Sequence, residues 1–142
     1  MKTGGTLTVI EGDHGSCFWH PETEASLKVW ECMIRAQALY GHNANIGREV
    51  YPLLVESEFT IDSIEPRYVY GDGFRPKLLD GMVNQMIIPM VETANQRSLE
   101  TGWVDEALWK QGITDLHAAG HPPTGTFFYT WFKAVGVKSI SL

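Results

Sequence analysis

Residues 6–14, Thr-Leu-Thr-Val-Ile-Glu-Gly-Asp-His, decide the fold that we expect for this 142-residue chain. β-Branched and apolar residues alternate with threonine over residues 6–10, and a turn at Gly4 and Gly5 leads into them. The pattern predicts a strand over residues 6–10 that ends in the polar segment 11–14. Open α/β sheets bind their ligands at such carboxyl ends of strands. We therefore expect functional side chains directly after this strand.

Two further strands are predicted. Residues 59–65 are rich in residues that favour strands, and Pro66 confines any continuation to Tyr70 to a sheet edge or a loop. Residues 126–137 are apolar on both faces, which is typical of a central strand. Residues 15–20 are expected to form a short aromatic loop.

The segments between these predicted strands have the apolar periodicity of helices. Apolar residues recur at helical spacing after Pro21, which suits the first position of a helix, and Gly41 is placed to end it. Residues 46–55 predict a short helix that Pro52 strains. The strongest stripe, over residues 79–94, predicts a helix that Pro89 kinks and Gly102 closes, and a further helix is expected between Asp105 and Gly120.

The composition narrows the class of protein. The length and the 44% hydrophobic fraction predict a single domain over residues 1–142 with an ordinary core. The net charge of −6 without a Lys/Arg cluster argues against a nucleic-acid surface, and the absence of a long apolar run argues against a membrane protein. The chain also opens without an apolar leader, and two cysteines, Cys17 and Cys32, fit a reducing compartment, so we expect a cytoplasmic protein.

Three segments together resemble class I S-adenosylmethionine-dependent methyltransferases. Met1-Lys2-Thr3-Gly4-Gly5 is similar to the turn before the fifth strand of that family. Residues 41–50, with Leu53, Leu54 and Phe59, look like the lead into the sixth strand, and residues 125–138 look like the closing antiparallel strand. The order and spacing of these motifs carry the resemblance.

The resemblance implies the C-terminal half of such an enzyme: an α/β, three-stranded, partial Rossmann-like sheet with its last strand antiparallel and central, and about four helices. Residues 1–20 would form the strand and the substrate-side loop, and residues 71–123 a helical, lid-like insertion. The Gly-rich cofactor loop belongs to the N-terminal half of the family. Gly71-Asp72-Gly73 lacks the spacing to replace it.

The expected function is therefore the substrate-side portion of an S-adenosylmethionine-dependent methyltransferase that acts on a small-molecule acceptor and is incomplete by itself. S-adenosylmethionine would bind only if the missing half is supplied, and no cofactor is expected for the isolated chain. The alternatives are a non-catalytic binding or dimerisation module and a truncated fragment without independent activity. Because the first strand would have an unpaired edge, we expect a homodimer or a complementing N-terminal half.

Asp13 and His14 are the candidate catalytic residues, because an imidazole beside a carboxylate can act as a general base. The alternative is that both side chains only solvate a loop. His14 with His20, and His117 with His121, do not match a known zinc pattern, so no metal site is expected. Cys17 lacks the surroundings of a nucleophile and is interpreted as a semi-buried thiol.

The remaining candidates are substrate-binding residues. Aromatic side chains in loops can line a small-molecule pocket, although they can equally seal the end of a core. Met86 belongs to the helical stripe, which is the best candidate for a lid and is otherwise core or interface. The proposed substrate-binding set is Glu11, Phe18, Trp19, His20, Tyr70 and Met86.

Overall fold

The alternating segment that opens the chain forms strand β1, Thr6–Gly12, in the computed structural model, which describes residues 1–139. Leu7 and Val9 are half-buried on one face of β1, whereas Thr8 and Ile10 are exposed on the other. This inside–outside alternation is what the period of a strand with one covered face requires.

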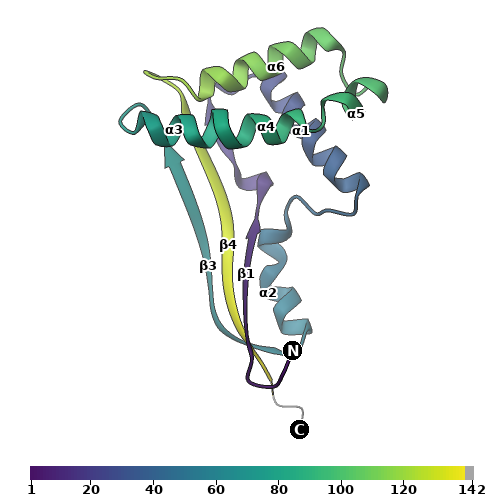
Figure 1. Ribbon diagram of the computed structural model, residues 1–142, viewed down its shortest axis with the longest axis vertical. Coiled ribbons are helices and arrows are strands. Elements are labelled where there is room, and N and C mark those ends of the chain that lie inside the picture. Colours follow the sequence, from purple (N-terminus) through teal and green to yellow (C-terminus); the bar gives the residue numbers. More distant parts are fainter. Residues whose placement is uncertain (140–142) are drawn as a thin grey trace. The chain divides into compact units, whose positions relative to one another are not determined.

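The chain has an α/β fold whose sheet contains four antiparallel strands (Figure 1). Strand β4, Thr126–Lys138, pairs antiparallel with β1 and with the short strand β2, Phe18–His20, and it also pairs with β3, Phe59–Gly71. The expected three-stranded sheet is therefore corrected in strand number and order.

Two sequence features explain these differences. Strand β2 lies within the expected aromatic loop and has only three residues, too few for a period of two to be recognised. Strand β3 continues through Pro66 to Gly71. Pro66 is tolerated because, within residues 1–139, β3 pairs only with β4 and is thus an edge strand.

The described chain divides into two compact units. The sheet unit comprises Met1–Ser16, Ala44–Tyr68 and the chain from Thr130 onward, and the helical unit comprises Cys17–Asn43 and Val69–Tyr129. Strands β3 and β4 contribute residues to both. The single domain over residues 1–142 stays a prediction.

The helical unit is built around helices α1, Glu24–Leu39, and α6, Glu106–Ala119, which pack against each other. Thr23 caps α1, since its hydroxyl accepts from the Ser26 amide and the Ser26 hydroxyl accepts from the Thr23 amide. A Cβ atom at Gly112 of α6 would lie 2.5 Å from the Ala25 carbonyl oxygen, so glycine permits the close approach of the two helices.

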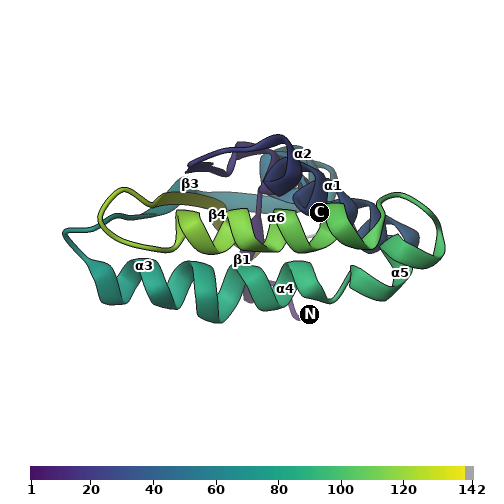
Figure 2. The ribbon, with the colours of Figure 1, turned by 90° about the horizontal axis from the view of Figure 1, so that it is seen from above.

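The long helix expected over residues 79–94 is divided. It consists of α3, Pro76–Met82, a π-helical segment, Val83–Ile87, and α4, Ile88–Glu92, and α5, Asn95–Glu100, follows. Pro89 has no amide proton, and in a regular α-helix its ring would clash with the carbonyl group one turn earlier. The wider turn of the π-helical segment before Pro89 relieves this clash. Figure 2 shows α6 lying alongside the line of α3 and α4.

One large core fills the helical unit. Its fully buried members include apolar side chains from α1, the α3–α4 segment, α6 and β4, among them Val29, Met33, Leu79, Val83, Ile87, Leu116 and Phe127.

The sheet unit has a smaller core. Helix α2, Ile46–Glu56, lies beside β1 (Figure 1). The buried apolar side chains are Val50 and Leu54 of α2 and Ala134 of β4, and partly buried side chains of β1 and β3 pack around them. Within residues 1–139 no helix is both long and apolar enough to cross a membrane.

Candidate functional site

The polar segment after β1 forms a tight turn in the sheet unit. His14–Ser16 is a single 3₁₀ turn, and the Ser16 amide donates to the Asp13 carbonyl oxygen over 3.0 Å. The His14 amide donates to the Ala44 carbonyl oxygen over 2.8 Å, and the Thr130 hydroxyl donates to the Asp13 carbonyl oxygen over 3.2 Å. The backbone of Asp13 and His14 is thus fixed by hydrogen bonds from three directions.

Arg48, on the first turn of α2, holds the Asp13 side chain. Its Nε donates to Asp13 Oδ1 over 2.9 Å, and its Nη2 donates to Asp13 Oδ2 over 3.1 Å. The Ser16 hydroxyl donates to the same carboxylate. Asp13 is buried, whereas about half of the Arg48 side chain is exposed. This two-point ion pair ties the turn after β1 to the start of α2.

Glycine 47 allows this arrangement. A Cβ atom at Gly47 would lie 2.9 Å from the Gly12 carbonyl oxygen and 2.9 Å from Phe132 Cδ2. The first turn of α2 therefore touches the carboxyl end of β1 directly, which brings Arg48 within reach of Asp13. Any larger residue at position 47 would separate the two.

The electrostatics give the two candidate catalytic residues different roles. Burial would raise the pKa of the Asp13 carboxyl, but the hydrogen bonds from Arg48 and Ser16 and the charge of Arg48 outweigh it, and the pKa lies below its usual value. Burial lowers the pKa of His14, and the charge of Asp13 opposes this only in part. At neutral pH, Asp13 is ionised and His14 is neutral, so the imidazole can accept a proton.

The predicted site residues fall into both units. Glu11, Asp13 and His14 belong to the sheet unit, whereas Phe18, Trp19, His20, Tyr70 and Met86 belong to the helical unit. The convergence of the two groups on one substrate stays a prediction.

Within the helical unit, the predicted residues differ in exposure. Trp19 is buried, its ring packs against Trp30 and Phe127, and its indole N–H donates to the Ser26 hydroxyl over 3.0 Å. Phe18 is half-exposed and stacks on Phe128 with the ring centroids 4.5 Å apart. His20 and Met86 are exposed, and Tyr70 is half-buried.

The histidine pairs considered as metal ligands do not form a larger cluster. Among residues 1–139, no group of three or more His, Cys, Asp or Glu side chains is placed to hold a metal ion. His117 Nδ1 instead forms a 2.8 Å hydrogen bond with Asn84 Oδ1.

The sequence did not identify Arg48 as a functional residue. Its partner lies 35 residues away in the chain, so no local spacing connects the two. The signals were its position three residues after Asn45, on the first turn of a predicted helix, and its place within residues 41–50, which contribute to the family resemblance.

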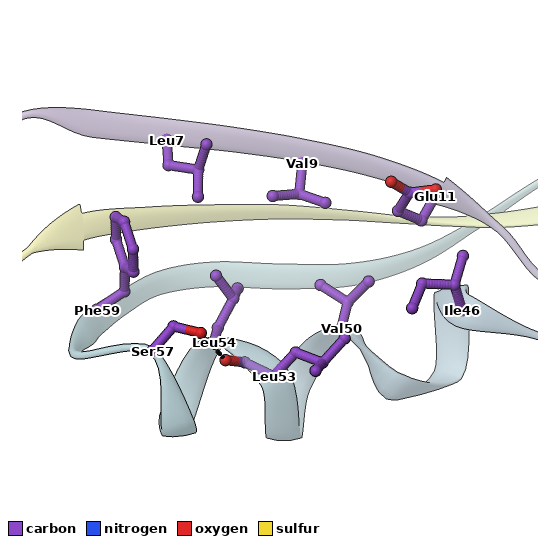
Figure 3. A pocket seen from close by; sticks show the side chains of 9 residues that line it. All are labelled: Leu7, Val9, Glu11, Ile46, Val50, Leu53, Leu54, Ser57 and Phe59. Carbon is purple, nitrogen blue, oxygen red and sulfur yellow. Dashed lines mark hydrogen bonds between the residues drawn. The ribbon is translucent and has the colours of Figure 1, made fainter. Parts of the chain in front are cut away.

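An apolar groove lies next to this turn in the sheet unit, between one face of β1 and helix α2 (Figure 3). Its cavity volume is about 270 Å³. The polar side chains that line it are Glu11 and Ser57, and the apolar ones are Leu7, Val9, Ile46, Val50, Leu53, Leu54 and Phe59. The sequence analysis did not predict this groove.

Comparisons with known proteins give no family for this chain: no protein-family model matches it, and no curated protein matches it in sequence. The function therefore has to be inferred from the geometry of the site.

Proposed function

We propose that this chain is the substrate-side part of a class I S-adenosylmethionine-dependent methyltransferase, and that the turn after β1 contacts a small-molecule methyl acceptor. The observation that carries the proposal is the position of His14 at the carboxyl end of β1, on a turn that the Asp13–Arg48 ion pair fixes; burial there lowers the pKa of His14. His14 then acts as the base that takes the proton from an acceptor hydroxyl. Asp13 is the positioning residue, because Arg48 and Ser16 occupy its carboxylate.

The pairing of the strands supports the family. In the resemblance, the last strand lies antiparallel between the two other strands of the C-terminal half. Strand β4 pairs antiparallel with β1 over seven residue positions, from Thr6↔Val137 to Gly12↔Trp131, and it also pairs with β3. This arrangement is compatible with the proposal, although strand β2 adds to it.

The residues present do not fit S-adenosylmethionine. The nearest glycine-rich turn, Gly71-Asp72-Gly73, lacks the Gly-x-Gly-x-x-Gly spacing, and its Gly71 packs against α3, where a Cβ atom would lie 3.1 Å from Leu79 Cα. We therefore expect calorimetric titration of the isolated chain with S-adenosylmethionine to give no micromolar affinity. Micromolar binding, about 8 kcal/mol, would require a cofactor site in this chain and would contradict the proposal.

Acceptor binding is tested by amide-resolved NMR titration with 4-hydroxybenzoate, hydroquinone and glucose as representative hydroxyl compounds. The expected result is that one of them shifts the amides of residues 13–16 and of the first turn of α2 at millimolar concentration. His14→Gln should weaken that binding, whereas His121→Gln, on an exposed histidine of the helical unit, should not. Shifts confined to other residues, or none with any of the three compounds, would contradict the proposed site.

A second candidate function is a dimerisation module, which the outer edge of β1 favours. Within residues 1–139, β1 pairs only with β4, and Ile10 is 61% exposed beside this edge. Strands with such edges pair readily with a second copy. Light scattering at micromolar concentration should then give a dimer that Ile10→Lys dissociates and Leu39→Lys, on an exposed residue of α1, does not. A monomer whose mass Ile10→Lys leaves unchanged would exclude this candidate.

A further inference from the structure

The groove between β1 and α2 combines an apolar wall with one acidic end. Leu7 and Val9 of β1 face Val50 and Leu54 of α2 across it, and Phe59 lies near one end (Figure 3). Glu11 and Ile46 lie at the opposite end. The groove is therefore an elongated apolar site with a carboxylate at one end.

The two polar residues of the groove differ in whether their side chains form hydrogen bonds or ion pairs. The Ser57 hydroxyl donates to the Leu53 carbonyl oxygen. The Glu11 carboxylate, in contrast, forms neither an ion pair nor a hydrogen bond with any side chain in residues 1–139. Arg48, on the neighbouring turn of α2, bonds Asp13 instead. Glu11 is thus a half-buried negative charge beside apolar side chains, without a cation of its own.

A carboxylate at the end of an apolar groove favours a ligand that brings a positive charge, since an ammonium group can form a charge-assisted hydrogen bond with it. The rest of the groove favours hydrocarbon, because burying methylene groups against Leu7, Val9, Val50 and Leu54 removes apolar surface from water. We propose that the groove binds a linear alkylamine, with the ammonium group at Glu11 and the alkyl chain directed along β1 toward Phe59.

The strand sets the length of the ligand. The rise of about 3.3 Å per strand residue gives about 13 Å between Leu7 and Glu11, the length of a chain of about ten carbon atoms. Affinity should therefore rise with each added methylene group, by about threefold for a groove that is open to water on one side, and stop rising near this length.

This ligand site goes beyond the proposed methyl-acceptor site. It involves neither the side chain of Asp13 nor that of His14, and a protonated amine held at Glu11 has no free lone pair with which to accept a methyl group. Its success or failure is therefore independent of the test with hydroxyl compounds.

The test is an amide-resolved NMR titration of the whole chain with butylamine, hexylamine, octylamine and decylamine below their aggregation concentrations. Octanoate and octanol serve as probes of the same chain length with a negative and a neutral head. We expect the amines to shift the amides of β1 and α2, octylamine to bind about tenfold more tightly than hexylamine, and octanoate to bind at least tenfold more weakly than octylamine.

Glu11→Gln should reduce octylamine affinity about tenfold and leave octanol binding unchanged, which also verifies that the groove of the variant is folded. The matched control is Glu56→Gln, an exposed carboxylate at the end of α2 that does not line the groove. The proposal would be overturned if octylamine and octanoate bound equally well, or if Glu11→Gln left the octylamine affinity unaltered. Amide shifts outside β1 and α2, or no binding at millimolar amine, would also overturn it.

Discussion

The two units of this chain differ in how completely they bury their apolar side chains. In the helical unit, Val29, Leu116 and Phe127 are fully buried within one large cluster that includes side chains from several helices. In the sheet unit, only Val50, Leu54 and Ala134 form the buried cluster, and Leu7, Val9, Phe59, Ile61 and Ile64 around them stay partly exposed. The sheet unit thus has apolar surface left over, and such surface marks binding sites for ligands or partners.

The candidate catalytic site follows the same division. Both candidate catalytic residues, the ion pair with Arg48 and the groove with its acidic end belong to the sheet unit. The helical unit has a large, fully buried core, whereas the sheet unit combines a hydrogen-bonded polar turn with apolar side chains that are only partly buried. We infer that the sheet unit carries the binding function, and each prediction below tests this difference.

The largest expected effect compares the same substitution in both cores. Leu116→Ala removes a fully buried side chain of the helical unit and should cost about 4 kcal/mol of unfolding free energy, because the cavity is closed on all sides. Leu54→Ala in the sheet unit should cost only about 2 kcal/mol, because the space opens into the groove. Urea denaturation followed by circular dichroism measures both. Equal losses would mean that the two cores are packed equally well.

A smaller effect is expected for the ion pair of the sheet unit. Asp13→Asn keeps the size of the side chain but removes the charge that Arg48 bonds at two points, and it should cost about 2 kcal/mol. The matched control is Glu65→Gln. Glu65 and its partner Arg67 are both exposed, so this substitution should lower the free energy of unfolding by less than about 0.5 kcal/mol. If the two variants lose the same stability in urea, the Asp13–Arg48 pair does not fix the turn.

Acidification should destabilise the turn in two stages. The pKa of His14 in the folded chain lies below 6.5. As the pH falls below 6.5, His14 is therefore protonated in the unfolded chain before it is protonated in the folded one. The free energy of unfolding declines over this range until the pH has passed the folded pKa. The folded pKa of Asp13 lies below 3.8, so its contribution is lost only in stronger acid.

Urea midpoints measured between pH 7.5 and pH 3 test this order. His14→Gln should flatten the profile just below pH 6.5, and Asp13→Asn should flatten it below pH 3.8. An unchanged profile in His14→Gln would show that this imidazole is not buried in its neutral form.

The sequence predicted the regular elements better than the irregular ones. The β1 segment and the α1 helix ended by Gly41 could be predicted because alternation, helical spacing and a stop signal agree there. The π-helical segment before Pro89 could not be predicted, since a wider turn leaves the same apolar stripe in the sequence. Strand β2 is defined by its pairing with β4, which lies more than 100 residues away in the chain.

The same limit applies to the site. The sequence placed Asp13 and His14 at a strand end, and the chemistry of an imidazole beside a carboxylate suggested their role. It did not reveal that Arg48 holds the carboxylate. The groove was also not predicted, because Leu7, Val9 and Val50 have the spacing of ordinary core residues. Contacts between distant segments determine both features.

Native-state hydrogen exchange tests most directly whether the sheet unit is the open part and the helical unit the filled core. The account predicts that amides in the middle of α1 and α6 exchange only through the opening reactions with the highest free energy. The β1 amides that bond β4 should open at a free energy at least about 1 kcal/mol lower. Equal opening free energies for β1, α1 and α6 would contradict the account, because the sheet unit would then be as completely packed as the helical one.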